Sequence, residues 1–137
     1  MGGGISGNKV SYSYNGSGNQ YVALGGGVYV GKTATVTMTA GSITGNNVSY
    51  KGKSEYSSGG GGVAIDVKMS GTTVDGGGKF TMEGGKIKDN TITNENTDDT
   101  GLVVGEDVLV KWQENRNEGP FFNKISATVG SEVVYQR

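Results

Sequence analysis

Short runs of alternating apolar and polar residues recur along the chain, and glycine-rich stretches separate them. Val28-Tyr29-Val30 alternates with period two, and after the turn Gly31-Lys32 the residues Ala34, Val36 and Met38 alternate with threonines. Period two places one set of side chains on the core side of a β-strand and the other set toward solvent. Runs of this kind, bounded by glycine turns, predict an all-β chain with almost no α-helix.

One six-residue motif occurs three times without a gap. Its pattern is Ile-x-[Gly/Asp]-Asn-x-[Val/Ile], and we call it the Ile-Asn motif; it occupies residues 5–10, 43–48 and 87–92. Spaced internal repeats are typical of folds in which equivalent positions stack on one another. We therefore predict a right-handed parallel β-helix, a solenoid of about three to four coils, with the motif at one corner of each coil and loops leaving that corner.

Stacking predicts ladders of equivalent residues about 4.8 Å apart. Ile5, Ile43 and Ile87 would form an inward ladder. Asn8, Asn46 and Asn90 would form a column of side-chain amides, each donating to the next, with Asn holding a corner conformation that it tolerates well. Two further ladders are expected: Val28, Val63 and Leu102, and Met38, Met82 and Trp112. A β-sandwich is the structural alternative, but it gives no reason for Ile and Asn to recur together.

Polar segments interrupt the repeats, and they carry the candidate binding residues. Residues 11–21 and 49–58 both follow the Ile-Asn motif, so their loops should lie side by side. They contain serine, glycine and asparagine together with tyrosine, a mixture typical of binding surfaces. The candidate binding residues are Tyr12, Tyr14, Tyr21, Tyr50 and Tyr56. The alternative is that these tyrosines only cover the strands beneath them.

Two other segments are less regular. Residues 66–78 are either a bulged extra strand or an insertion. Residues 101–137 are expected to form the last coil and a cap, because residues 102–112 match residues 28–38 position by position. A cap is needed where an end coil would otherwise expose a strand edge.

Composition narrows the possible chemistry. With 137 residues the chain is expected to form one domain, and its 27 glycines suit turns between strands. The absence of Cys and His removes thiolate and imidazole ligands and the commonest general base. A net charge of −1 gives no footprint for nucleic acid. The start lacks a signal-peptide pattern and enters the repeat midway, so the chain is expected to be a fragment of a longer repeat protein or, alternatively, to have a natural end with an incomplete first coil.

The sequence resembles the repeats of bacterial right-handed β-helix surface proteins, the adhesin-like and polymorphic-outer-membrane-protein-like group. The resemblance rests on the Gly-Gly-Gly-Val-Tyr-Val run, the threonine-rich strand, Met-x-[Gly/Ala]-Gly-x-Ile and the closing Gly-Asn. It covers residues 2–10, 25–48, 60–92 and, more loosely, 101–112, and it lacks clear Phe-x-x-Asn repeats. It implies a secreted or cell-surface location and carries over no catalytic residue.

The distribution of acidic residues and threonines argues against enzymatic and ice-binding functions. A polysaccharide-degrading enzyme needs paired carboxylates or a Ca²⁺ cluster with a basic residue. The only arginine outside the terminus is Arg116. The candidate acids do not recur at one coil position and are expected to be solvated turn acids: Asp66, Asp75, Asp98, Asp99, Glu106 and Asp107. Weak Ca²⁺ binding by Glu95, Asp98 and Asp99 stays open. The threonine row 33–39 does not recur on later coils, which argues against ice binding.

The expected function is that of a non-enzymatic, extracellular or cell-surface binding module without a cofactor. Its partner would be a host or bacterial surface glycan or protein, with no nucleic acid and no membrane insertion. The alternative function is structural, a stalk or fibre formed by end-to-end self-association, because the first coil has no strand partner below it.

Overall fold

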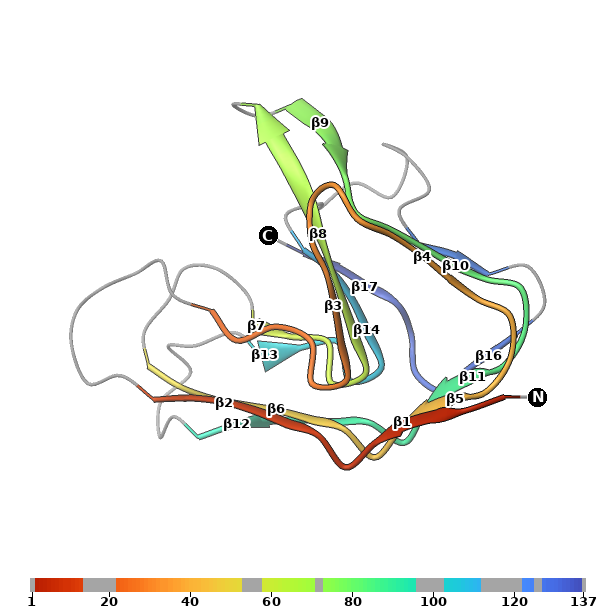
Figure 1. The fold of residues 1–137 in the computed structure, drawn as a ribbon. Helices are drawn as coiled ribbons and strands as arrows, with labels where there is room; N and C mark the ends of the chain where they lie inside the picture. The colour runs from red at the N-terminus through yellow and green to blue at the C-terminus, as the bar shows by residue number, and fades with distance from the viewer. Residues whose placement is uncertain are drawn as a thin grey trace.

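The chain is all-β in the computed structural model (Figure 1). The structure describes residues 2–13, 22–52, 58–70, 73–95, 103–111, 122–124 and 127–136. Every regular element among them is a β-strand, and the strands pair in parallel except in one hairpin. The predicted all-β class is confirmed.

The strands form four sheets, each named here after its first strand, and one short pair. The β1 sheet contains β1 (Gly4–Ser6), β5 (Ser42–Thr44), β11 (Lys86–Lys88) and β16 (Thr128–Val129). The β2 sheet contains β2 (Lys9–Ser13), β6 (Asn47–Lys51) and β12 (Thr91–Asn94). The β3 sheet contains β3 (Val28–Val30), β8 (Val63–Ser70), β14 (Val108–Lys111) and β17 (Val134–Gln136). The β4 sheet contains β4 (Thr35–Met38), β10 (Lys79–Met82) and β15 (Phe122–Lys124). The β7 pair joins β7 (Ser58–Gly59) and β13 (Val103–Val104), with Leu24 bridged to Gly59.

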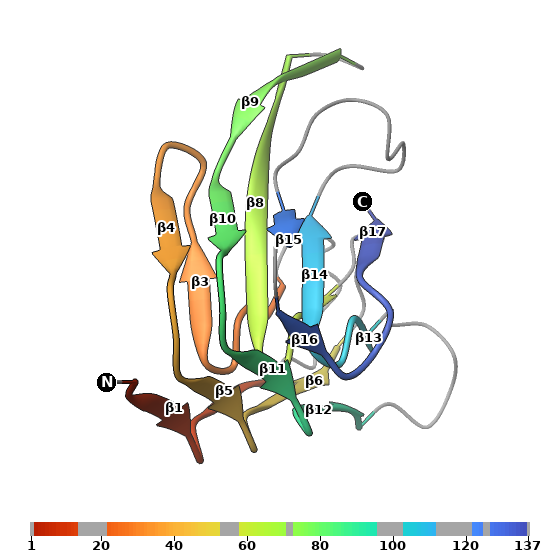
Figure 2. The same ribbon diagram turned by 90° about the vertical axis from the view of Figure 1, so that its right-hand side faces the viewer.

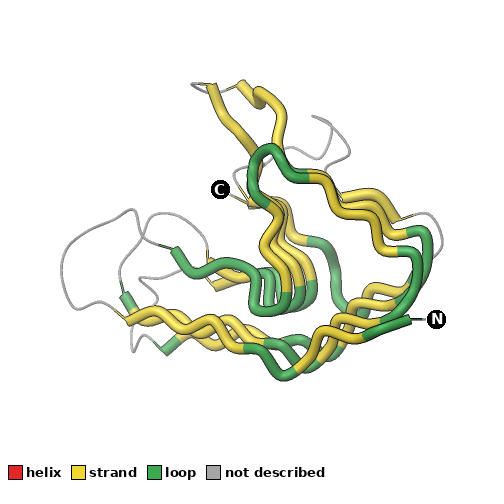
Figure 3. Tube along the Cα trace, in the orientation of Figure 1, coloured by secondary structure: helices red, strands yellow, loops and turns green. Residues whose placement is uncertain are grey.

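The chain visits these sheets repeatedly in one order: β1 sheet, β2 sheet, β7 pair, β3 sheet, β4 sheet. We call one such passage a circuit. Successive circuits overlie one another in Figure 3, and in Figure 2 they follow one another from the N-terminal side to the C-terminal side. After β16 the chain runs through residues 130–133 directly to β17, so the last passage omits the β2 sheet and the β7 pair.

Two apolar cores lie inside each circuit because the chain folds back on itself at the β7 pair (Figure 1). The main core is enclosed by the β1, β3 and β4 sheets, and its buried members include Ile43, Ile65 and Phe80. The small core lies between the β2 sheet and the β7 pair and contains Ala23, Val48 and Tyr50, with further residues packed against them. The alternation predicted for Val28 to Val30 is confirmed, since Tyr29 is exposed between two core-facing valines.

The predicted isoleucine ladder is confirmed in all three circuits, and the other two ladders are confirmed in the first two circuits and corrected in the third. Ile5 pairs with Ile43 and Ile43 with Ile87, and Val129 extends this ladder. Val28 pairs with Val63, as predicted, but Val63 then pairs with Val108, not Leu102. Met38 pairs with Met82, as predicted, but the next position is Lys124, not Trp112. Leu102 and Trp112 themselves lie outside the described residues.

The third circuit is shifted because its corner matches the earlier ones through a different run of residues. Gly105-Glu106-Asp107-Val108 occupies the place of Gly60-Gly61-Gly62-Val63, as the backbone hydrogen bonds from Gly61, Gly62 and Val63 to residues 105–107 establish. The predicted match of residues 102–112 to residues 28–38 was therefore six positions out of register at Val28 and twelve at Met38. It followed the similar pair Val30-Gly31 and Val104-Gly105 and missed the corner.

Both tyrosine-rich segments begin as strands, which corrects the predicted loops. β2 continues to Ser13 and β6 to Lys51, so Tyr12 and Tyr50 are opposite each other in parallel strands. Residues 66–78 do not correspond fully to either prediction, the bulged extra strand or the insertion. They contain the end of β8 and β9 (Thr73–Gly77), which pair as an antiparallel hairpin with an irregular register between Val67 and Met69. Ala34, predicted to point inward, is exposed in the turn before β4.

Candidate functional site

The Ile-Asn motif turns the chain through a residue with positive φ. That residue is the third of the motif: Gly7 and Gly45 have φ of 69°, and Asp89 has φ of 58°. The left-handed region costs non-glycine residues free energy, although Asp tolerates it better than most. The conformational demand therefore falls on the residue before the asparagine, which corrects the expectation that Asn itself holds the special conformation.

The asparagines form the predicted column of side-chain hydrogen bonds. Asn8 Nδ2 donates to Asn46 Oδ1 at 3.0 Å, and Asn46 Nδ2 donates to Asn90 Oδ1 at 3.0 Å. The backbone N–H of each residue donates to the same oxygen, at 3.1 Å and 3.0 Å. Asn46 and Asn90 also donate to the preceding circuit, since Asn46 Nδ2 reaches the Ile5 carbonyl and Asn90 Nδ2 reaches the Ile43 carbonyl. The column thus ties each circuit to the next.

A carboxylate, not a fourth asparagine, ends the column. Asp107 Oδ1 accepts hydrogen bonds from Asn90 Nδ2 at 2.8 Å and from the Asn90 backbone N–H at 3.2 Å. Its Oδ2 accepts from the Ser131 backbone N–H at 2.7 Å, and its own N–H donates to Ser131 Oγ at 3.1 Å. Asp107 is 2% exposed. It therefore supplies the acceptor that a further circuit would have supplied, and residues 130–133 close over it.

Glycines let a second corner of each circuit pack against the column. We call residues 25–27, 60–62 and 105–107 the glycine corners. A Cβ on Gly27 would lie 2.9 Å from Asn46 Nδ2, and one on Gly62 would lie 2.7 Å from Asn90 Nδ2. The equivalent residue of the third corner is Asp107, whose side chain enters the column at this point. A side chain is thus accommodated only where the column ends.

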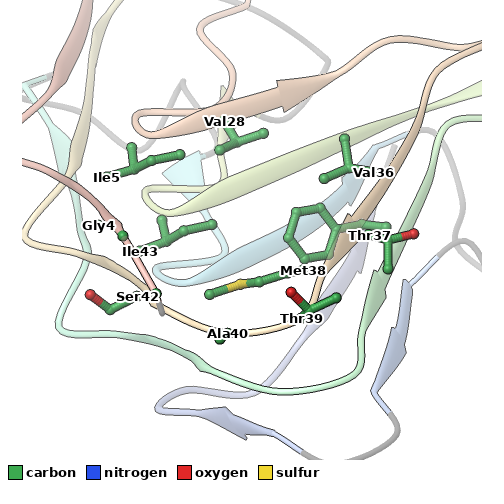
Figure 4. A pocket seen from close by; sticks show the side chains of 13 residues that line it. Gly4, Ile5, Val28, Val36, Thr37, Met38, Thr39, Ala40, Ser42 and Ile43 are labelled. Atoms are coloured by element: carbon green, nitrogen blue, oxygen red, sulfur yellow. The ribbon is translucent and has the colours of Figure 1, made fainter.

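The opposite end of the molecule is open. The outermost strands there are β1, β2, β3 and β4, each of which has a described partner on one side only. Figure 4 shows a hollow at this end, surrounded by apolar side chains that include Ile5, Val28, Val36, Met38 and Ile43. Its volume is about 500 Å³. Ile5 is 39% exposed, whereas Ile43, one circuit further in, is buried. The hollow is the uncovered end of the main core.

A second hollow of about 510 Å³ opens over the small core and the outer face of β3. Val10, Tyr12 and Ala23 line it from the small core, and Tyr29, Lys32 and Asp66 line it from the β3 side. The Tyr29 hydroxyl donates to Asp66 Oδ2. Burial raises the pKa of Tyr29 well above its usual value, and the hydrogen bond to the Asp66 carboxylate and its negative charge act in the same direction.

The candidate binding tyrosines divide into two groups. Tyr12 and Tyr50 stack on each other in the small core, with ring centroids 5.5 Å apart and an interplanar angle of 14°. Tyr50 is 1% exposed, so in this structure it is a core residue and offers no surface for a ligand. Tyr12 is half-buried and lines the second hollow. Tyr14, Tyr21 and Tyr56 lie outside the described residues.

Two of the acidic candidates are not the solvated turn acids that the sequence predicts. Asp107 is the buried end of the column, and Asp66 is 7% exposed beside Tyr29. Glu106 and Glu95 are exposed, and Ser49 Oγ donates to Glu95. Asp98, Asp99 and Arg116 lie outside the described residues, and so does the side chain of Asp75. Within the described part of the chain, no group of three or more acidic side chains is placed to hold a metal ion.

The sequence contained a signal for the role of Asp107. The run Gly105-Glu106-Asp107-Val108 aligns without a gap with Gly60-Gly61-Gly62-Val63, so an acid stands where the other corners have glycine. That substitution marks the position at which a side chain replaces a stacked amide. Tyr29, in contrast, had no signal beyond its outward place in an alternating strand.

Comparison with protein-family models, with curated proteins and with solved structures finds no significant match. No helix in the described part of the chain is long and apolar enough to cross a membrane. Conclusions about function therefore rest on the geometry of this chain.

Proposed function

We propose that the chain is a non-enzymatic structural module, a right-handed parallel β-helix whose open N-terminal end takes up another layer of strands. The repeated order of sheets, the in-register parallel pairing and the asparagine column all support this fold. The winding supports the hand: in Figure 1 the chain runs clockwise as it recedes from the N-terminal strands, and Figure 2 gives the same direction of advance. Right-handed crossovers are also the rule between parallel strands.

The observation that supports this function is that both apolar cores are uncovered at the N-terminal end. Both hollows open there, one over each core. A strand in a parallel sheet also leaves half its backbone donors and acceptors unpaired on a free edge, which is a template for another strand. One added layer would cover both cores and pair these edges together.

The test is the size of the protein in solution across a concentration series, measured by sedimentation velocity. We expect reversible association in the wild type and its loss in Ile5→Lys, which places a charge in the hollow. Thr35→Lys is the matched control, because Thr35 is exposed on the first circuit but is not among the residues that line either hollow. Monomers at every concentration, with a fully exchanging first circuit, would contradict the proposal.

Ligand binding at a cell surface is the second candidate, and the second hollow favours it. Aromatic rings from Tyr12 and Tyr29, with the polar groups of Lys32 and Asp66, give a groove a mixture of stacking faces and hydrogen-bonding groups. A glycan or a protein loop is the proposed ligand, and a secreted or cell-surface location follows from the sequence resemblance.

A glycan array with Tyr29→Ala tests this second candidate. Thr37→Ala, on an exposed position of β4, serves as the control. We expect a ligand whose signal falls about tenfold or more in Tyr29→Ala alone. An unchanged pattern of binding in both variants would place any ligand site elsewhere.

A further inference from the structure

Charge is distributed unevenly along the chain. Residues 1–54 contain Lys9, Lys32, Lys51 and Lys53 and no acidic residue. All 13 Asp and Glu residues follow, from Glu55 onward, together with the remaining basic residues. The first part of the chain is therefore basic and the rest is acidic, although the whole carries a net charge of only −1.

The stacking of circuits converts this sequence asymmetry into a polarity between the two ends. Lys9 and Lys32 are exposed at the N-terminal end, on β2 and just after β3. Glu106 and Glu132 are exposed at the other end, in the third glycine corner and just before β17. Figure 2 shows these two ends on opposite sides of the molecule. The ends of two copies are thus electrostatically complementary to each other.

The main-core ladders are also unfinished at both ends. Ile5 and Val129 end the ladder of the β1 sheet, and both are at least partly exposed. β3 and β17 are the outer strands of the β3 sheet, and the half-buried Val28 and Val133 lie at those two edges. Placing β1 of one copy beside β16 of another, and β3 beside β17, continues both sheets in parallel. This is the pairing that the circuits already use within the chain.

We propose that a second copy of this chain is the partner of the N-terminal end, docking head to tail through its acidic C-terminal end. The proposal rests on the stacking function above and adds the identity of the partner and its orientation. Such a contact is heterologous and does not close, so it produces polar filaments with one orientation of all copies.

A head-to-head dimer is the competing arrangement, and two observations disfavour it. It would bring Lys9 and Lys32 of both copies together, and like charges across an interface are unfavourable. A two-fold axis would also make the outer strands antiparallel, unlike any pairing between circuits.

Complementary charge reversal separates these arrangements. One variant carries Lys9→Glu and Lys32→Glu, and the other carries Glu106→Lys and Glu132→Lys. Each variant alone should associate about tenfold more weakly than the wild type, or worse. An equimolar mixture should recover association, because every contact then joins either two native ends or two reversed ends. Wild-type association should weaken as salt rises above physiological strength, where screening shortens the Debye length below about 8 Å.

The control variant carries Lys79→Glu and Lys86→Glu, an equal change of charge at exposed positions on β10 and β11, which are inner strands of their sheets. It should associate like the wild type, and circular dichroism should show the strand signal in all four proteins. Two outcomes would overturn the head-to-tail proposal and leave the stacking function intact. One is association that neither charge reversal weakens, and the other is a mixture that stays monomeric while the wild type associates. A wild type that is monomeric at every concentration would overturn both.

Discussion

The two ends of the asparagine column are built differently. At the C-terminal end Asp107 is buried and accepts three hydrogen bonds, from Asn90 and from Ser131. At the N-terminal end Asn8 is exposed, and no group in the described part of the chain donates to its Oδ1. The column is therefore finished at one end and open at the other.

The difference shows what a column of stacked amides needs in order to end. Within the column, each asparagine side chain donates to the next residue toward the C-terminus, so the last asparagine needs an acceptor that does not itself donate onward. A carboxylate meets that need because it is an acceptor only. At the N-terminal end Asn8 Oδ1 needs the opposite, a donor, and the described part of the chain offers none there. The column therefore ends because Asp stands where a further Asn would have continued it.

The largest expected effect comes from removing the terminating acceptor. Asp107→Ala leaves the Asn90 side chain, the Asn90 N–H and the Ser131 N–H without their acceptor. Because buried donors without partners are costly, we expect a loss of about 3 kcal/mol in the free energy of unfolding. Urea denaturation measures it.

Asn8→Ala is the matched change at the open end. It removes an exposed side chain, so we expect a loss below about 1 kcal/mol. Equal losses in the two variants would mean that the ends are equivalent, contrary to the geometry.

A smaller loss should follow from crowding the contact between the glycine corner and the column. In Gly62→Ala the new Cβ would meet the Asp107 carbonyl oxygen at 2.6 Å and Asn90 Nδ2 at 2.7 Å. We expect destabilisation of about 2 kcal/mol from overpacking. At the open end nothing lies within 4 Å of a Cβ on Gly3, so Gly3→Ala should leave the urea midpoint unchanged. A tolerated Gly62→Ala would show that the two corners are not tightly packed.

The turn residues of the Ile-Asn motif allow a change of the opposite sign. Asp89 is the one described non-glycine residue with positive φ, and the other copies use glycine there. Asp89→Gly should stabilise the protein by about 0.5 kcal/mol, whereas Gly45→Ala should destabilise it by about 1 kcal/mol. Thermal unfolding of the two variants provides the measurement, and a destabilised Asp89→Gly would count against relief of backbone strain.

The smallest effect concerns Tyr29 and alkaline pH. Its pKa is higher in the folded protein than in the unfolded chain, so the folded state holds its proton longer. Stability from this group is present below the unfolded pKa, near 10, and is lost as pH rises from there toward the folded pKa. Wild type should therefore lose stability more steeply above about pH 10 than Tyr29→Phe. Parallel curves for the two proteins would exclude this linkage.

Much of the fold was predictable because it depends on local repeats. The Ile-Asn motif fixed the corner, the isoleucine ladder and the amide column, since each copy has the same spacing between Ile and Asn. The alternation of Val28, Tyr29 and Val30 followed from period two, and Tyr29 is exposed between two core-facing valines. These features can be read from patterns within short segments, although the column itself joins residues 38 and 44 positions apart.

The predictions that were wrong depend on which corner aligns one circuit with the next. Val104-Gly105 resembles Val30-Gly31, but the third circuit is aligned by hydrogen bonds at its glycine corner, and Asp107 hides that match. Tyr50 was predicted at a surface because its segment is polar, yet β6 carries it into the small core. That second core was not predicted at all, because it arises from the chain folding back within one circuit.

Hydrogen exchange of four backbone amides tests the difference between the ends most directly. The N–H groups of Asn8, Asn46, Asn90 and Ser131 each donate to an oxygen of the column. In dilute protein Asn8 should exchange by local fraying, orders of magnitude faster than Ser131, with Asn46 and Asn90 close to the global rate. At concentrations where copies associate, protection of Asn8 should rise toward that of the others. Slow exchange of Asn8 equal to that of Ser131 in dilute monomer would contradict an open N-terminal end.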